Sequence, residues 1–393
     1  MRKWGIVLLG LICLEVHCQD SFYDHVSLGS YDVGFCDSII YDDEIHYNQY
    51  GYEGKIPIFL QIWFPASASP NQEFMESGDY RNRTVPKELG QVYEALCERM
   101  DESYIRDGIT YDVSTDQPID YGSNTYTDIL DHIKSQKTRS IRMEMPPNSN
   151  FPVIVYHHGS QGMSDENSIM AEYFASRGYI FISANFHLPY PNTPFGLLPY
   201  HLEKESKHNQ STAKNVLKFA RSITSRENVF FIGHSWGAQE GWCFLHEETL
   251  ANGFVSMETT IEFKTDSFEI KEKWPYVYNA IKTKRNKFSI PILLFAAKEN
   301  NTNFDFFKDS STKKMIYASY NDPFAHNSYT SFYMSRYFLK DEIKQPDAET
   351  LLSQIKGYKA HLDFIYSFLE SIRSKEAFQA NKLHRIFQID QKG

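Results

Sequence analysis

Gly233-His234-Ser235-Trp236-Gly237 follows the short apolar run 229–232 and precedes a helical stretch that opens at Ala238. The two glycines allow a turn so tight that the serine hydroxyl points out of the expected sheet. The N-terminus of the helix behind the turn favours developing negative charge. A serine hydroxyl is a weak nucleophile until a base takes its proton. We therefore predict that Ser235 is a catalytic nucleophile.

Strand, turn and helix in this order are typical of the nucleophile elbow of α/β-hydrolases, in which the acid and the base follow the serine along the chain. His326 follows the expected strand 315–319 and fits the place of the base. His361 competes with it, but lies in an expected amphipathic helix, where a histidine more often belongs to one face. His246 lies on the helix after the serine, and His384 lies in the tail.

The acid has three candidates in two places. Glu258 ends the apolar run 254–257, which we expect to form the strand after the elbow helix. Glu299 and Asp305 follow the next expected strand, 290–296. A carboxylate in either place would fix the tautomer of the histidine and stabilise the imidazolium. We expect Glu258 to be the acid and keep Glu299 and Asp305 as alternatives.

Two backbone N–H groups should bind the oxyanion. One is that of Trp236, directly after the serine. The other should come from the loop after the expected strand 153–156, where Gly159 lets the backbone approach a ligand, so that Gly159 and Ser160 are the candidates. The adjacent His157 and His158 could suggest a metal, but no third ligand is near in sequence. We expect no metal and no cofactor.

From residue 151 onward, strands and helices alternate, which predicts a doubly wound, mostly parallel sheet of the α/β-hydrolase fold. We expect antiparallel strands at 31–35 and 56–64 to precede it. The other expected strands are 153–156, 179–184, 229–232, 254–257, 290–296 and 315–319, and the expected helices are 167–177, 212–223, 238–250 and 351–372.

Residues 67–149 form an insertion, or cap, because their apolar periodicity is too weak for a core of their own. Within it we expect helices at 86–100 and 126–137. A proline-rich loop is expected at 189–208. Residues 19–393 then form a single α/β-hydrolase domain with this insertion.

The N-terminal residues 1–18 read as a secretory signal peptide. A basic start at Arg2 and Lys3 precedes the apolar run 4–14, which is too short to span a bilayer. Cleavage would leave Gln19 first, so we expect a secreted or periplasmic protein. Lipidation at Cys18, which would anchor a lipoprotein, is the alternative.

Charge and cysteine content bound the partners. The chain has 40 basic and 50 acidic residues, a net charge of −10, which argues against a nucleic-acid partner. Beyond the signal peptide, Cys36 and Cys97 could pair in an oxidising compartment, and Cys243 reads as a buried thiol. No protein partner can be inferred from the sequence.

Five sequence elements occur together and in order, at 59–66, 152–159, 173–179, 233–237 and 325–329. Over roughly residues 55–375 the chain thereby resembles the platelet-activating factor acetylhydrolase group and its dienelactone-hydrolase-like relatives. The resemblance implies an acid directly after the strand that follows the elbow helix, which favours Glu258. It also implies that the N–H groups of Ser160 and Trp236 form the oxyanion hole.

The chain also departs from these families. Glu258 stands where the acetylhydrolases have aspartate, and Ser235 stands where true dienelactone hydrolases have cysteine. The insertion 67–149 and the loop 187–210 differ enough that the substrate does not carry over.

The resulting hypothesis is a secreted serine esterase that acts through an acyl-enzyme. The resemblance implies a short-chain acyl ester, small or lipid, and a membrane surface as one place to find it. The alternatives are a peptidase or polysaccharide deacetylase with the same triad, and a non-enzymatic binding protein on the same fold. The residues that could line an aromatic pocket are Phe186, His187, Tyr190, Phe195 and Trp236.

Overall fold

The computed structural model of the chain describes most of its length, with gaps. The expected signal peptide 1–18, with Cys18, lies outside the described part. Five other residues named above also lie outside it: Gln19, Phe195, Glu299, Asp305 and His384. The described residues are 23, 25–68, 71–105, 111–112, 117–118, 120–145, 150–160, 163–192, 203–224, 228–246, 250–259, 267–283, 288–297, 315–322, 324–339, 348–379 and 385–392.

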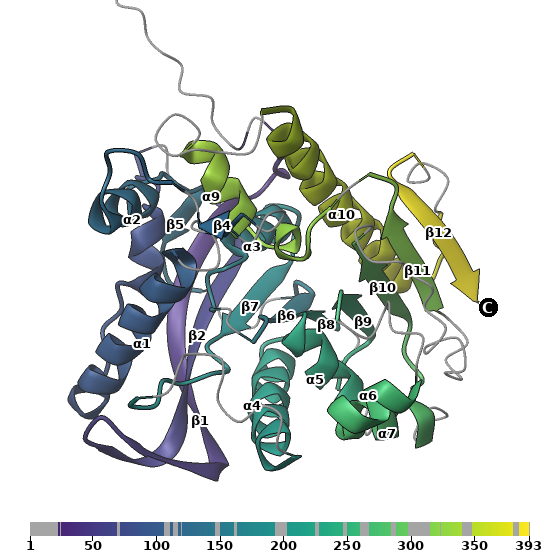
Figure 1. The fold of residues 1–393 in the computed structure, drawn as a ribbon, viewed down its shortest axis with the longest axis horizontal. Coiled ribbons are helices and arrows are strands. Elements are labelled where there is room, and N and C mark those ends of the chain that lie inside the picture. The colour runs from purple at the N-terminus through teal and green to yellow at the C-terminus, as the bar shows by residue number, and fades with distance from the viewer. Residues whose placement is uncertain are drawn as a thin grey trace, which may run out of the picture.

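A ten-stranded sheet runs through the centre of the described chain in the order β12-β11-β10-β9-β8-β6-β7-β2-β1-β5 (Figure 1). The six strands from β11 to β7 are mutually parallel, whereas β2 and β12 join them antiparallel. The predicted mostly parallel sheet with N-terminal antiparallel strands is therefore confirmed. The strands are β1 (Asp32–Gln49), β2 (Tyr52–Ala66), β5 (Ser140–Arg142), β6 (Val153–His157), β7 (Ile180–Ala184), β8 (Val229–His234), β9 (Gly253–Met257), β10 (Ile292–Ala296), β11 (Met315–Tyr320) and β12 (Phe387–Lys392).

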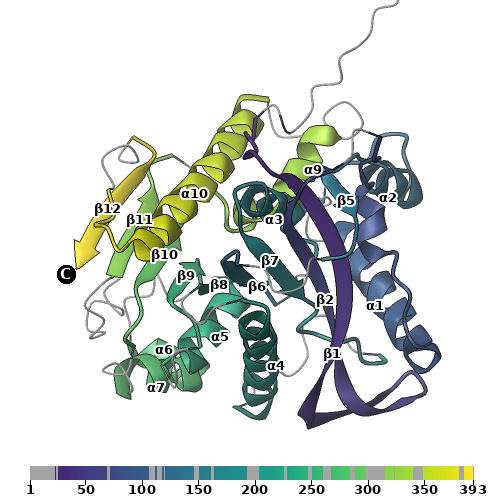
Figure 2. The same ribbon diagram turned by 180° about the vertical axis from the view of Figure 1, so that it is seen from behind.

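Helices cover both faces of the sheet (Figure 1, Figure 2). In β8, the buried Phe230 packs with α3 and α10 on one face, and its neighbour Phe231 packs with α4, α5 and α7 on the other. Successive side chains of a strand point to opposite faces, so a continuous apolar run serves two cores. The helices are α1 (Gly90–Ser103), α2 (Tyr126–Lys134), α3 (Ser168–Ala175), α4 (Glu203–Ser222), α5 (Trp236–Phe244), α6 (Ser267–Lys273), α7 (Pro275–Thr283), α9 (Phe332–Phe338) and α10 (Ala348–Ser374).

Two local predictions are wrong. Helix α4 begins at Glu203, so the proline-rich loop expected at 189–208 is helical over its last part. Helix α5 ends at Phe244, well before residue 250. A further short hairpin joins β3 (Tyr111–Asp112) and β4 (Gln117–Pro118).

The insertion packs against the main sheet. Leu89, Val92 and Leu96, at and before α1, share a buried cluster with Phe59 of β2. They are joined there by Met163, from the loop before α3. Figure 1 places α1 and α2 beside the β1–β2 hairpin. The insertion thus buries its apolar side chains in a core that it shares with the sheet.

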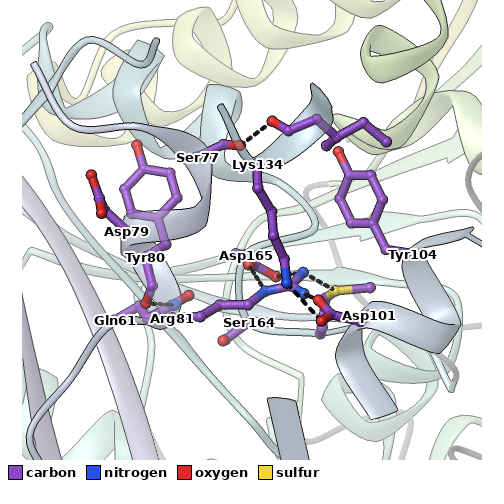
Figure 3. A network of polar contacts seen from close by, with 12 residues as sticks. Gln61, Ser77, Asp79, Tyr80, Arg81, Asp101, Tyr104, Lys134, Ser164 and Asp165 are labelled. Carbon is purple, nitrogen blue, oxygen red and sulfur yellow. Dashed lines mark hydrogen bonds and ion pairs between the residues drawn. The ribbon is translucent and has the colours of Figure 1, made fainter. Parts of the chain in front are cut away.

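A buried arginine ties the insertion to the loop before α3 (Figure 3). Arg81 Nε lies 2.7 Å from the Asp165 carboxylate, and the same guanidinium also pairs with Asp101 of α1. Lys134 of α2 lies 2.7 Å from the second oxygen of Asp101. The side chains of Arg81 and Asp165 are only 9% and 6% exposed. Two elements of the insertion are therefore fixed to one loop of the main domain.

Replacing Arg81 should destabilise the fold strongly. Arg81→Met would leave the buried carboxylate of Asp165 without its cation, which typically costs about 3–5 kcal/mol of unfolding free energy. Urea unfolding of the wild type and the variant measures this loss. Arg99→Met is the matched control, because Arg99 pairs with Glu102 at 2.9 Å on a more exposed helix face. We expect it to cost less than about 1 kcal/mol. Equal losses of unfolding free energy in the two variants would contradict the conclusion that the buried Arg81–Asp165 pair stabilises the fold.

Candidate active site

The turn between β8 and α5 is strained. Ser235 has φ 51° and ψ −113°, a region that residues other than glycine rarely adopt. A Cβ on Gly233 would lie 2.5 Å from the amide nitrogen of Ala238, and one on Gly237 would lie 2.3 Å from the carbonyl oxygen of His157. Both glycines are therefore required by close backbone approaches, as the motif predicts. Ser235 itself is half-buried.

His326 and Glu258 form a hydrogen bond. His326 Nδ1 lies 3.0 Å from Glu258 Oε2, and the other carboxylate oxygen accepts from the Ala297 N–H at 2.9 Å. A carboxylate only accepts, so Nδ1 carries the proton and Nε2 is left as the basic nitrogen. The Glu258 side chain is wholly buried, and the His326 side chain is 33% exposed. The imidazole is thus held by a buried carboxylate and reaches the surface.

Backbone contacts bring these two residues to the elbow. The Ser235 N–H donates to the Met257 carbonyl at 2.9 Å, so the serine and Glu258 lie at the ends of neighbouring strands. His234 Nε2 lies 3.2 Å from the His326 carbonyl oxygen, and the two rings are 4.8 Å apart. The three predicted catalytic residues therefore lie close together at the carboxyl ends of the central strands.

One predicted oxyanion donor, Trp236, and the residue before the other, Gly159, adjoin Ser235. Trp236 is the first residue of α5, whose N-terminal amides are not used by the helix ladder. Gly159 lies against the serine, because a Cβ there would be 3.4 Å from the Ser235 Cβ. Ser160 follows it and is half-buried. The loop after β6 and the start of α5 therefore flank the serine from two sides.

The predicted aromatic residues divide into two groups. Phe186 stacks on His157, the last residue of β6, with ring centroids 3.8 Å apart. Tyr190 instead packs edge-on against Tyr47 in the cluster beneath the insertion. The ring centroids of Trp236 and Tyr276 of α7 lie 5.9 Å apart. Tyr276 was not among the predicted residues. Tyr276 lies on α7, a helix of nine residues that was not predicted.

A buried cluster of polar side chains near the elbow was also not predicted. Tyr156 donates to Glu166 Oε1 at 2.5 Å, and His234 Nδ1 lies 3.8 Å from the same oxygen. Asn167 donates to the Tyr329 carbonyl at 3.0 Å. These contacts reach His234, the residue before Ser235, and Tyr329, three residues after His326. The only sequence signal was a short polar run before α3, which resembles an ordinary loop.

The other histidines have structural surroundings. His361 is fully buried among aromatic rings, including that of Tyr329 at 5.5 Å. Burial, with a smaller contribution from His234, lowers its pKa to about 3. His246 is buried and packs against Phe288 at 5.5 Å. His361 therefore lies on one face of helix α10, as expected, and that face packs into the core.

Several remaining expectations can be placed. Cys36 and Cys97 are unbridged thiols, and Cys243 is a buried one. No three His, Cys, Asp or Glu side chains within the described ranges are grouped as a metal ion requires. None of the helices in the described part is both long and apolar enough to cross a membrane.

Comparison with known proteins identifies the fold. No family model matches the chain, and no curated protein matches its sequence. A ferulic acid esterase from Streptomyces cinnamoneus is similar over 93% of this chain and 98% of its own, with a TM-score of 0.56 and 13% identity. The chain therefore has the predicted α/β-hydrolase fold.

Two other solved structures are more distant. An acylaminoacyl peptidase from Pyrococcus horikoshii is similar over 62% of this chain and 41% of its own, at 16% identity and a TM-score of 0.41. An esterase from Thermogutta terrifontis with bound propionate is similar over 58% and 86%, at 15% identity and a TM-score of 0.39.

The buried His361 should make the fold sensitive to acid. Its pKa in the folded chain is lowered to about 3, whereas an unfolded histidine takes up a proton near pH 6.5. Below pH 6.5 the unfolded state binds more protons, so stability falls as the pH falls towards 3. Between pH 7 and pH 5 this histidine should cost about 2 kcal/mol.

His361→Leu isolates that contribution. Urea unfolding at pH 7 and pH 5 gives the acid-induced loss for the wild type and the variant, and the variant should lose about 2 kcal/mol less. Stability at pH 7 need not match, because only the difference between the two pH values matters. The same loss in both proteins would show that His361 is not buried neutral.

Proposed function

We propose that the chain is a serine hydrolase of carboxylic esters, with Ser235 as nucleophile, His326 as base and Glu258 as the acid that orients it. One observation carries the proposal: the buried Glu258 holds His326 at 3.0 Å directly beside the strained Ser235 turn. Strained backbone at a polar residue is often found where function over-determines the conformation. The ferulic acid esterase that shares the fold supports an ester as the substrate class.

The chemistry follows from the positions of these groups. Nε2 of His326 takes the Ser235 proton as the serine oxygen attacks the ester carbonyl. The N–H groups of Trp236 and Ser160 bind the resulting oxyanion, and their fixed dipoles cost no reorganisation. His326 then protonates the leaving alcohol, and Glu258 stabilises the imidazolium meanwhile. Water then attacks the acyl-enzyme while His326 takes its proton. His326 returns this proton to the Ser235 oxygen as the carboxylic acid is released.

The finer proposal is an acetylhydrolase-like enzyme for a short acyl chain. Trp236, directly after the serine, pairs with the ring of Tyr276, and Phe186 stacks on His157 at the end of the strand that leads into the Gly159 loop; these bulky rings near the elbow support a small acyl group. The alcohol would be a small molecule or a phospholipid reached at a membrane surface. Export by a signal peptide over residues 1–18, with anchoring at Cys18 as the alternative, belongs to the same proposal.

Ser235→Ala should abolish hydrolysis of p-nitrophenyl acetate, with a loss in kcat of about 10³-fold or more, because no other group supplies the acyl-enzyme. It should also abolish labelling by a fluorophosphonate. Ser222→Ala, on the exposed end of α4, is the control and should react as the wild type does. Retention of a tenth of the activity by Ser235→Ala would mean that another nucleophile operates.

A substrate panel separates the enzymatic rivals. Acyl esters of increasing chain length, acylated peptides and acetylated glycans are compared by kcat/KM, and we expect acetyl and propionyl esters to rank first. A peptide or glycan ranking first would make the chain a peptidase or a deacetylase. No turnover and no fluorophosphonate labelling would leave a binding protein on the same fold.

Glu258→Gln should lower kcat by about 10³–10⁴-fold with little change in KM, because an amide cannot stabilise the imidazolium. Glu258→Asp shortens the side chain by one methylene and should leave partial activity. Glu299→Gln and Asp305→Asn should both be mild. An active Glu258→Gln beside an inactive variant at either other carboxylate would move the acid to the segment after β10.

A further inference from the structure

Both ring nitrogens of the buried His158 are engaged by backbone. Its Nδ1 lies 2.7 Å from the carbonyl oxygen of Gly159, and its Nε2 lies 3.2 Å from the amide nitrogen of Phe186. A carbonyl only accepts and an amide N–H only donates, so Nδ1 carries the proton and Nε2 is the acceptor. Burial lowers the pKa of His158, in keeping with this neutral form. The ring therefore has one tautomer and one orientation.

The bond from Nδ1 acts on a particular peptide unit. The Gly159 carbonyl and the Ser160 N–H belong to the same planar trans peptide and point in opposite directions. Whatever fixes the carbonyl therefore fixes the direction of the N–H. Gly159 has no Cβ, so this peptide could otherwise turn over at little steric cost. The neighbouring peptide has its own anchor, because His187 Nδ1 lies 2.9 Å from the Ser160 carbonyl.

We propose that His158 is a positioning residue that aims the Ser160 N–H at the oxyanion formed on the Ser235 ester carbonyl. This rests on the proposed function, in which Ser160 supplies one of the two oxyanion donors. Gly159 lies against the serine, with 3.4 Å between its would-be Cβ and that of Ser235, so the aimed peptide adjoins the reacting atoms. A hydrogen bond at the carbonyl end also polarises the peptide and strengthens its N–H as a donor.

Two substitutions of His158 each keep one of its two hydrogen bonds and remove the other. In His158→Asn, the amide nitrogen can take the place of Nδ1 and still donate to the Gly159 carbonyl. In His158→Gln, the longer side chain can bring its oxygen to the place of Nε2, where it accepts from the Phe186 N–H. The Asn variant therefore keeps the bond that aims Ser160, and the Gln variant keeps only the other one.

The expected result is a split between the variants. His158→Gln should lower kcat for p-nitrophenyl acetate by about 10²-fold, the scale of a lost oxyanion donor, with little change in KM. His158→Asn should stay within a few-fold of the wild type. The ratio of ester to thionoester hydrolysis should fall in the Gln variant only, because a developing sulfur anion gains less from an N–H donor than an oxyanion does.

Other outcomes overturn the proposal. Equal losses in the two variants with an unchanged ester-to-thionoester ratio would mean that His158 only fills space, and a Gln variant with normal kcat would mean that Ser160 needs no such anchor. If Ser235 takes up no fluorophosphonate in the wild type, the proposed function fails and this inference fails with it. A labelled serine with a normal Gln variant overturns the inference alone.

A measurement on the wild type guards against variants that fail to fold. Nitrogen-15 histidine spectra should show His158 protonated at Nδ1 and unprotonated at Nε2 throughout pH 6–8. A ring protonated at Nε2 instead could make neither backbone bond and would overturn the proposal.

Discussion

The close approach of the elbow to the end of β6 is the constraint on which the site depends. A Cβ at position 237 would collide with the His157 carbonyl. Because Gly237 has none, α5 can begin directly beside the loop that carries Gly159 and Ser160. Ser235, two residues earlier, has a positive φ of 51°. Packing at this point therefore places the tight turn at Ser235 beside the loop that follows β6.

Much of this arrangement could be predicted from the sequence because its signals are local. The central strands are short apolar runs, and the turn is marked by two glycines around a serine. His326 and Glu258 could be expected because the order of a triad along such a chain follows the order of the strands. In the structure they share a hydrogen bond of 3.0 Å. Their part in catalysis stays a prediction until it is measured.

The features that escaped prediction are those whose partners lie far apart in sequence. Arg81 meets Asp165 across 84 residues, and nothing near either one marks the pair. Glu166 and Asn167 become support for the elbow only when β6, β8 and the loop before α9 are assembled. Strand β12 and helix α6 are short and rich in polar residues, and helix α7 has only nine residues, so that tertiary packing decides all three. Tertiary contacts outweigh local propensity in all of these cases.

The positive φ angles carry a consequence for how such a chain can evolve. Among the described residues, five that are not glycine have positive φ, and two of them are Ser235 and Glu258. Each conformation costs folding free energy that a glycine would relieve. Selection for heat resistance alone would therefore favour changes at the two positions that the proposed chemistry needs. Lineages that keep both residues are therefore expected to be under selection for activity. In descendants without that selection, these two residues should be replaced first, and the free energy of unfolding should rise.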